Sequence, residues 1–149
     1  MDKFLLSIAA WAARRLPRPI TQALYKIKPV ARLIRGSLNK AAPHGLSRVK
    51  VAAGDLAGIE LYLDLQSEKD YWLGTYEMDL QAAVHTLVPP GTIAYDVGAN
   101  IGYISLLLAR HVGSGGRVIA FEALPANIER LRKNLESSGF AERVQVVQA

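Results

Sequence analysis

The chain has 149 residues, of which 50% are hydrophobic and 21% are charged. This length allows one ordinary domain, and the composition is that of a folded protein. The chain contains no cysteine, which excludes disulfide frameworks, thiolate zinc sites and cysteine nucleophiles. Its three histidines are scattered along the sequence, so we expect no metal site. No apolar run approaches the ~20 residues that cross a bilayer, so we expect a cytoplasmic protein with at most peripheral membrane contact.

The net charge of +5 is distributed unevenly along the chain. Residues 1–50 hold eleven lysines and arginines against one acid, whereas residues 51–149 hold seven bases and twelve acids. Segments that differ this much in charge usually have different roles. We therefore expect a basic amphipathic helical arm over 1–45, a β-hairpin and helix lead-in over 46–90, and a partial parallel α/β domain over 91–149.

Apolar residues in the basic arm recur at helical spacing. Phe4, Ile8 and Trp11 follow this spacing, and Arg14-Arg15 closes the run. The stretch 20–38 repeats the mix of apolar and basic residues. A signal peptide fits poorly, because the arginines follow the apolar run instead of preceding it. Two interpretations stay open: an arm that lies on an anionic membrane surface or on nucleic acid, or a pair of solvated helices packed on the domain.

The lead-in contains two alternating segments followed by a helical one. Residues 48–51 and 59–64 alternate apolar and polar side chains, which predicts a β-hairpin with one buried face. Residues 78–88 carry apolar side chains at helical spacing, and Pro89-Pro90-Gly91 ends that helix.

The last part of the chain alternates strand and helix patterns. Short apolar strands are predicted over 92–97, 117–121 and 144–147, and amphipathic helices over 101–111 and 125–137. Strand, helix, strand, helix, strand with short loops is the pattern of a right-handed parallel α/β sheet.

The first strand of this part ends in a glycine-rich turn, DVGANIG over 96–102. Such a turn lies at the carboxyl edge of a parallel sheet, where ligands bind. Gly98 and Gly102 lack Cβ atoms, so the backbone can turn tightly and a ligand can lie against it. Glu122 ends the second strand, from which a carboxylate can accept hydrogen bonds from both hydroxyls of a ribose.

The pattern D-x-G-x-N-x-G differs from the dinucleotide fingerprint G-x-G-x-x-G. Asp96 precedes the first glycine and Asn100 occupies the middle of the turn. The Asp96 carboxylate would repel a pyrophosphate and attract a ligand that carries an ammonium and a sulfonium. Charge therefore favours S-adenosylmethionine over a nicotinamide dinucleotide.

At these residues the sequence resembles the FkbM family of class I methyltransferases, over roughly residues 71–149. The resemblance rests on six motifs in the family's order and spacing. They are Tyr76-Glu77, Pro90-Gly91, DVGANIGY over 96–103, RVIAFE over 117–122, Pro125-Ala-Asn127 and LRKNL over 131–135. The resemblance implies a Rossmann-like methyltransferase sheet and methyl transfer from S-adenosylmethionine, usually to a hydroxyl oxygen. The implied acceptor is a small molecule or a saccharide, and nucleic acid is disfavoured.

The family's functional positions map onto the glycine turn and the end of the second strand. The expected cofactor-binding residues are Asp96, Gly98, Ala99, Asn100, Gly102, Glu122, Leu124 and Glu77. Three of these keep an alternative: Asn100 shapes the loop, Leu124 packs in the core instead of against adenine, and Glu77 is a solvated acid at a helix start. The chain departs from the family pattern at Ala123 and Ser138, where proline and asparagine are common.

A methyltransferase sheet normally has seven strands, and this sequence predicts three of them. We therefore expect the donor-binding N-terminal part of a longer enzyme. The alternative is a non-catalytic fragment or interaction module whose basic arm binds membrane or RNA. The sequence nominates no general base, no catalytic residue and no oligomeric state.

Overall fold

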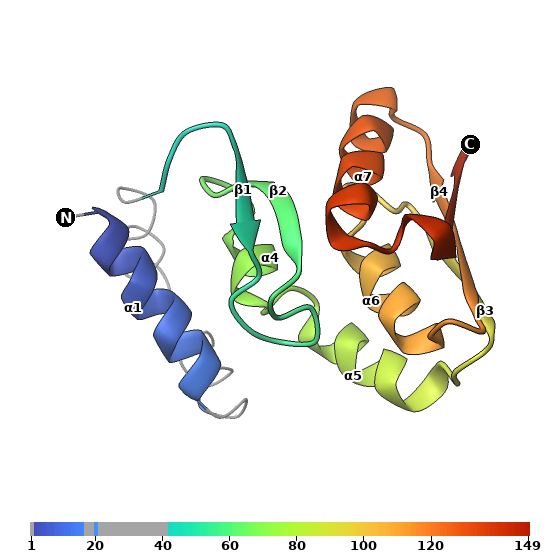
Figure 1. Ribbon diagram of the computed structural model, residues 1–149, viewed down its shortest axis with the longest axis horizontal. Helices are drawn as coiled ribbons and strands as arrows, with labels where there is room; N and C mark the ends of the chain where they lie inside the picture. Colours follow the sequence, from blue (N-terminus) through green and yellow to red (C-terminus); the bar gives the residue numbers. More distant parts are fainter. Residues whose placement is uncertain (1, 17–19, 21–41) are drawn as a thin grey trace. The chain divides into compact units, whose positions relative to one another are not determined.

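The structure is a computed structural model that describes residues 2–16, 20 and 42–149 (Figure 1). The stretch 20–38, predicted to repeat the amphipathic pattern, therefore lies almost entirely outside the described residues. The chain divides into two compact units. One comprises residues 1–58 and 63–76, and the other comprises residues 59–62 and 77–149.

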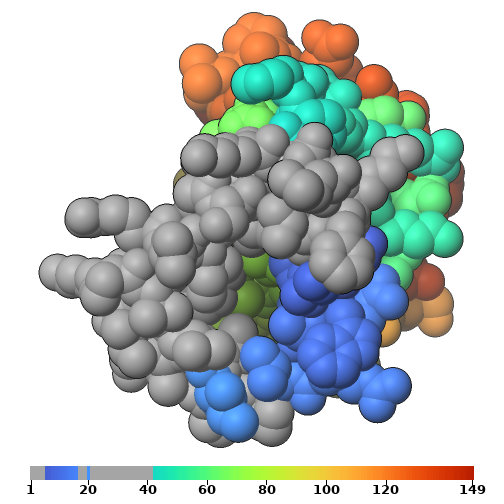
Figure 2. All heavy atoms as spheres, turned by 90° about the vertical axis from the view of Figure 1, so that its left-hand side faces the viewer, coloured from blue at the N-terminus to red at the C-terminus, as the bar shows by residue number. Residues whose placement is uncertain are grey.

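The first unit begins with a helix, α1 (Asp2–Arg15), which confirms the helix expected from the apolar spacing. Ile8 and Trp11 are 46% and 63% exposed, and α1 lies at the surface in blue in Figure 2. The Arg14 Nε donates a hydrogen bond to the Ala52 carbonyl at 3.1 Å. This bond ties the end of α1 to the segment around Ala52 in the same unit.

The expected pair of strands is confirmed. Strands β1 (Leu46–Lys50) and β2 (Glu60–Asp64) form a two-stranded sheet. Alternate residues of β2 are buried, whereas no residue of β1 is, so the predicted buried face is present in β2 alone. A short helix that the sequence did not reveal, α4 (Lys69–Leu73), follows and ends at Gly74. Gly74 has φ 73°, and a Cβ there would overlap the Ala53 carbonyl. Five residues make too few turns to display a helical period, which explains why α4 escapes detection. Among the residues of this unit that the structure describes, the buried apolar side chains are Ala42, Val51, Ala52, Leu56, Leu63, Leu65, Trp72 and Leu73.

The second unit is built on a parallel sheet, as the sequence predicts. Strands β3 (Ile93–Val97), β4 (Arg117–Glu122) and β5 (Val144–Gln148) lie in the order β3-β4-β5. Both pairings are parallel, with Asp96 opposite Ala120 and Glu122 opposite Gln148. The carboxyl ends of all three strands therefore meet at one edge.

Helices connect and flank these strands. The helices of the second unit are α5 (Met78–Leu87), α6 (Tyr103–Val112), α7 (Pro125–Ser138) and the 3-10 turn η1 (Ala141–Arg143). The first three were predicted to within about two residues at each end, whereas η1 was not predicted. None of the helices in the described ranges has the length and apolar character that a membrane span requires.

The two faces of the sheet differ in burial. Helices α6 and α7 lie on one side of it (Figure 1), and Val118 and Ala120 are completely buried there. On the opposite face Ile93, Tyr95 and Val97 are 61%, 64% and 83% exposed. Successive side chains of a strand alternate between faces, so the packed core of this unit lies between the sheet and its helices. Its apolar members are Leu61, Val84, Ala99, Ile101, Tyr103, Leu106, Leu107, Leu108, Ala109, Val112, Val118, Ala120, Ile128, Leu131, Leu135 and Val144.

Candidate functional site

The turn between β3 and α6 is fastened to the end of β4. The backbone N–H groups of Gly98 and Ala99 both donate to the Phe121 carbonyl at 2.9 Å. Gly102 N–H then donates back to the Ala99 carbonyl at 2.8 Å, which closes the turn. Gly98 and Asn100 are exposed, whereas Ala99 and Gly102 are buried. The turn therefore has a fixed inner side and an open outer side.

Three residues of this turn have left-handed backbone conformations: Gly98 with φ 83°, Asn100 with φ 51° and Gly102 with φ 92°. Asparagine tolerates this region better than most residues with a side chain. A Cβ on Gly102 would lie 3.2 Å from Leu131, whereas a Cβ on Gly98 would meet nothing within 4 Å. Gly102 thus permits close packing against α7, and Gly98 leaves space open to a ligand. The left-handed Gly102 also explains why α6 begins at Tyr103 and not at residue 101 as predicted.

Glu122, at the end of β4, is surrounded by hydrogen-bond donors. Its Oε2 accepts from the Asn100 N–H at 2.8 Å, and its Oε1 accepts from the Leu124 N–H at 2.9 Å and the Asn127 Nδ2 at 3.3 Å. The Leu124 and Asn100 N–H groups, in that order, lower the pKa of Glu122 below its ordinary value. Glu122 is therefore held as an anion next to the open side of the turn.

Asp96, one residue before the end of β3, has the opposite environment. Its side chain is 8% exposed, and its Oδ2 accepts a hydrogen bond from the Ser105 hydroxyl at 2.5 Å. Burial raises the pKa of Asp96, the hydrogen bonds from Ser105 oppose this shift, and the charge of Glu122 adds to it. Asp96 is thus the carboxyl group of the site that is more easily protonated.

The structure brings most of the expected site residues together, with one exception. The turn, Glu122 and the backbone of Leu124 form one continuous group through the hydrogen bonds above. The Leu124 side chain is 60% exposed, which contradicts the alternative that it packs in the core. Glu77 precedes α5 with φ 47° and is exposed. Among the residues that the structure describes, no hydrogen bond joins Glu77 to the turn.

Asn134, which was not predicted as a site residue, supports the turn from behind. It is 1% exposed, and its Nδ2 donates to the Ile101 carbonyl at 2.9 Å. Its Oδ1 accepts from the Tyr62 N–H at 2.7 Å. Asn134 lies on the apolar face of α7, between Leu131 and Leu135, and a polar side chain on such a face must find buried partners. The polar residue among the apolar positions of this predicted helix was the feature of the sequence that could have revealed its role.

Two histidines that lie far apart in the sequence meet in the second unit. The rings of His85 on α5 and His111 on α6 are 4.2 Å apart, edge to face. This pair forms an aromatic contact between α5 and α6.

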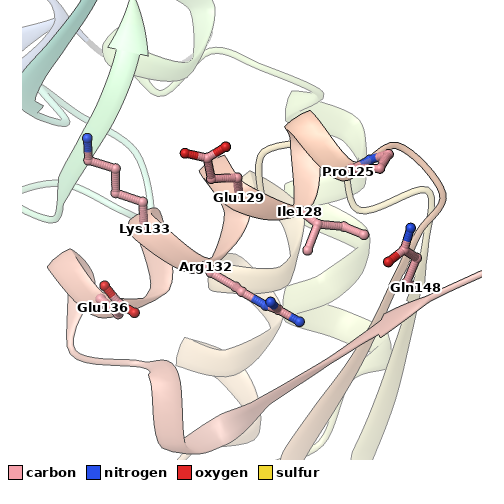
Figure 3. Close-up of a pocket in the computed structure, with 7 residues that line it drawn as sticks. All are labelled: Pro125, Ile128, Glu129, Arg132, Lys133, Glu136 and Gln148. Atoms are coloured by element: carbon pink, nitrogen blue, oxygen red, sulfur yellow. The ribbon is translucent and has the colours of Figure 1, made fainter.

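A groove of about 550 Å³ lies between α7 and the end of β5 (Figure 3). It is lined by Pro125, Ile128, Glu129, Arg132, Lys133, Glu136 and Gln148. Its two acids and two bases lie three or four residues apart along α7, so the opposite charges compensate one another. None of the turn residues, nor Asp96 or Glu122, lines this groove, so it is separate from the candidate site.

Residues 96–148 match the family model described as the methyltransferase FkbM domain. This segment of the chain is similar to that family. The match begins at Asp96 and contains the glycine turn, Glu122 and the two strands that follow β3. It confirms the expected resemblance to S-adenosylmethionine-dependent methyltransferases.

Curated relatives match part of the chain. A 58-residue stretch is 50% identical to protein-L-isoaspartate O-methyltransferase of Aeropyrum pernix and covers 39% of this chain and 22% of that protein. A 65-residue stretch is 46% identical to carboxy-S-adenosyl-L-methionine synthase of Pseudomonas putida, covering 40% and 26%. Catechol O-methyltransferase of Mycobacterium tuberculosis is 40% identical over 52 residues, covering 35% and 24%. The chain thus spans about a quarter of the length of these relatives.

Solved structures resemble the chain over a similar share. An O-methyltransferase from Bacillus cereus in complex with S-adenosylhomocysteine is 33% identical with a TM-score of 0.41, covering 47% of this chain and 31% of that chain. An RNA methyltransferase from Salinibacter ruber in complex with the same compound is 26% identical with a TM-score of 0.44, covering 49% and 47%.

Proposed function

We propose that residues 96–102 and Glu122 bind S-adenosylmethionine, and that the whole protein transfers its methyl group to a hydroxyl oxygen of a small molecule or saccharide. One observation carries this proposal. Two carboxyl groups, Asp96 and Glu122, flank a turn whose outer side is open at Gly98. Such a site suits a ligand with positive charge at one end and hydroxyl groups in the middle.

The ribose of the donor would bind at Glu122. A carboxylate has about four acceptor positions, two on each oxygen. Of the hydrogen bonds described above, two reach Oε1 and one reaches Oε2, so Oε2 is the oxygen with more acceptor capacity left. The Asn127 contact is the longest of the three at 3.3 Å, so its replacement by the second ribose hydroxyl would cost least. Glu122 is thereby suited to a vicinal diol.

The amino-acid end of the donor would lie toward Asp96. Both the ammonium and the sulfonium of S-adenosylmethionine are attracted by ionised Asp96 and Glu122, whereas a pyrophosphate is repelled by both. The exposed Leu124 side chain, two residues after Glu122, offers an apolar surface on which the adenine could lie. These charges favour the methyl donor over a nicotinamide dinucleotide.

Methyl transfer requires no covalent bond between the protein and the substrate. The bond between the methyl carbon and the positive sulfur breaks as a bond to the acceptor oxygen forms, and the acceptor proton leaves to a base. Alignment of oxygen, carbon and sulfur in one line accounts for much of the acceleration. The residues of this chain described above would hold the donor for that alignment.

Calorimetric titration of the 149-residue chain with S-adenosylmethionine, S-adenosylhomocysteine and NAD tests the proposal. We expect binding of the first two and none of NAD. Glu122→Gln should weaken binding about 10- to 100-fold, because a hydrogen bond to a charged group contributes about 1.5–3 kcal/mol. Glu129→Gln, an exposed acid on α7, is the matched control and should bind like the wild type. Binding of NAD alone, or an unchanged affinity in Glu122→Gln, would contradict the proposal.

A further inference from the structure

Ser105 is a buried hydroxyl in an apolar environment. It lies on α6 next to Leu106, Leu107 and Leu108, and both Ser105 and Leu106 are completely inaccessible to solvent. A hydroxyl removed from water without a partner is costly. Here the hydroxyl donates to Asp96 Oδ2 at 2.5 Å. The two residues are therefore a buried pair that joins α6 to β3 directly below the turn.

Ser105 is the source of hydrogen bonds to the Asp96 side chain. Its hydroxyl is one donor, and its backbone N–H also stabilises the carboxylate. Within the described ranges, the one charged group that acts on Asp96 is Glu122, at the end of the neighbouring strand. Because Glu122 is itself held as an anion, it disfavours a second negative charge at Asp96. Ser105 is thus what keeps a buried carboxylate at this position.

We propose that Ser105 is a positioning residue of the donor site, which holds the Asp96 carboxylate in place for the cationic amino-acid end of the ligand. The inference rests on the proposed function, since it assumes that a cationic donor occupies the turn. Ser105 is separated from solvent by its own burial, so it acts through Asp96 and does not touch the ligand itself.

The proposal predicts a specific change in titration. Ser105→Ala removes the hydroxyl and keeps the backbone N–H, so the pKa of Asp96 should rise further above its ordinary value of 3.8. Asp96 would then lose its charge at a higher pH than in the wild type. Ser105→Thr keeps the hydroxyl and should restore the titration, whereas Ser105→Cys keeps the size with a weaker donor and should give an intermediate midpoint.

The first measurement follows the Asp96 carboxyl carbon by ¹³C NMR in the free chain across a pH series. We expect the midpoint to rise in Ser105→Ala and to return in Ser105→Thr. Ser138→Ala is the matched control, because its hydroxyl donates to the Leu135 carbonyl at the end of α7 and should not affect Asp96. Identical Asp96 midpoints in wild type and Ser105→Ala would overturn the proposal. If Ser105→Ala does not fold, the comparison of Ser105→Cys with Ser105→Thr decides the same question.

The second measurement is the affinity for S-adenosylmethionine over the same pH series. We expect Ser105→Ala to weaken binding by up to about tenfold at pH values between the Asp96 midpoints of the two proteins, and by less at alkaline pH, where Asp96 is ionised in both. An equal loss at every pH would indicate a merely structural role and overturn the proposal. If the wild-type chain binds no S-adenosylmethionine, the proposed function fails, whereas the NMR titration still reports whether Ser105 holds Asp96.

Discussion

The ends of β3 and β4 each carry a carboxyl group, and the two groups have opposite environments. Glu122 receives three hydrogen bonds, two of them from backbone N–H groups, and its pKa is lowered. Asp96 is buried beneath the turn, receives its hydrogen bonds from Ser105, and has a raised pKa. Neighbouring strands of one sheet thus present one carboxyl group with a lowered pKa and one with a raised pKa.

The difference comes from where the chain goes after each strand. After β4 the backbone turns so that the Leu124 N–H faces Glu122, while the turn after β3 brings the Asn100 N–H to the same carboxylate. Asp96 precedes the end of its strand by one residue and faces the helix layer, where it is buried and receives its hydrogen bonds from Ser105. Burial therefore sets the direction of the pKa shift of Asp96, whereas backbone N–H groups set that of Glu122.

Disturbing the turn should give the largest effect. Gly102→Ala places a Cβ 3.2 Å from Leu131 in a left-handed conformation, so we expect a loss of about 2–4 kcal/mol in the free energy of unfolding. Gly98→Ala has only the conformational cost, about 1–2 kcal/mol, and should instead weaken donor binding. Urea unfolding and calorimetry measure the two quantities.

Gly139→Ala is the matched control for Gly98→Ala. Gly139 has φ 77°, a Cβ there meets nothing within 4 Å, and it ends α7 away from the turn. We expect it to cost as much stability as Gly98→Ala and to leave donor binding unchanged. Equal losses of binding in both variants would show that Gly98 affects the ligand only through stability.

Removing one charge at a time should separate the two carboxyl groups. Asp96→Asn should weaken S-adenosylmethionine binding about tenfold at pH 8 and progressively less at acid pH, where wild-type Asp96 also loses its charge. Glu122→Gln should weaken binding by a nearly constant factor over the same range, because its lowered pKa keeps Glu122 ionised. Parallel pH profiles of the two variants, measured by calorimetry, would remove the distinction between the groups.

Stability should respond to pH in opposite directions at the two positions. The lowered pKa of Glu122 stabilises the fold above its ordinary value of 4.5, and this contribution is lost as pH falls through the folded pKa. The raised pKa of Asp96 stabilises the fold below pH 3.8, the ordinary pKa of the group, and this contribution is lost as pH rises through the folded pKa. Urea unfolding from pH 3 to 7 should therefore show a weaker rise with pH in Glu122→Gln and a stronger one in Asp96→Asn. The same slope in both variants would contradict the assignment.

Much of the second unit could be predicted from the sequence, because its signals are local. The periods of β3, β4, β5, α6 and α7 are visible in consecutive residues, and the glycines of the turn mark their own positions. The partners of the carboxyl groups could not be predicted in this way. Ser105 reaches Asp96 across nine residues and Asn134 reaches Ile101 across 33, so these contacts depend on tertiary packing. The elements α4 and η1 are too short to show a helical period, so the sequence did not predict them.

A crystal structure of the chain with S-adenosylhomocysteine would show whether the two carboxyl groups bind the donor. We expect a ribose hydroxyl within hydrogen-bond distance of Glu122 Oε2 and the ligand ammonium on the side of Asp96. A nucleoside bound elsewhere, with both carboxyl groups directed away from it, would show that the turn is not the donor site.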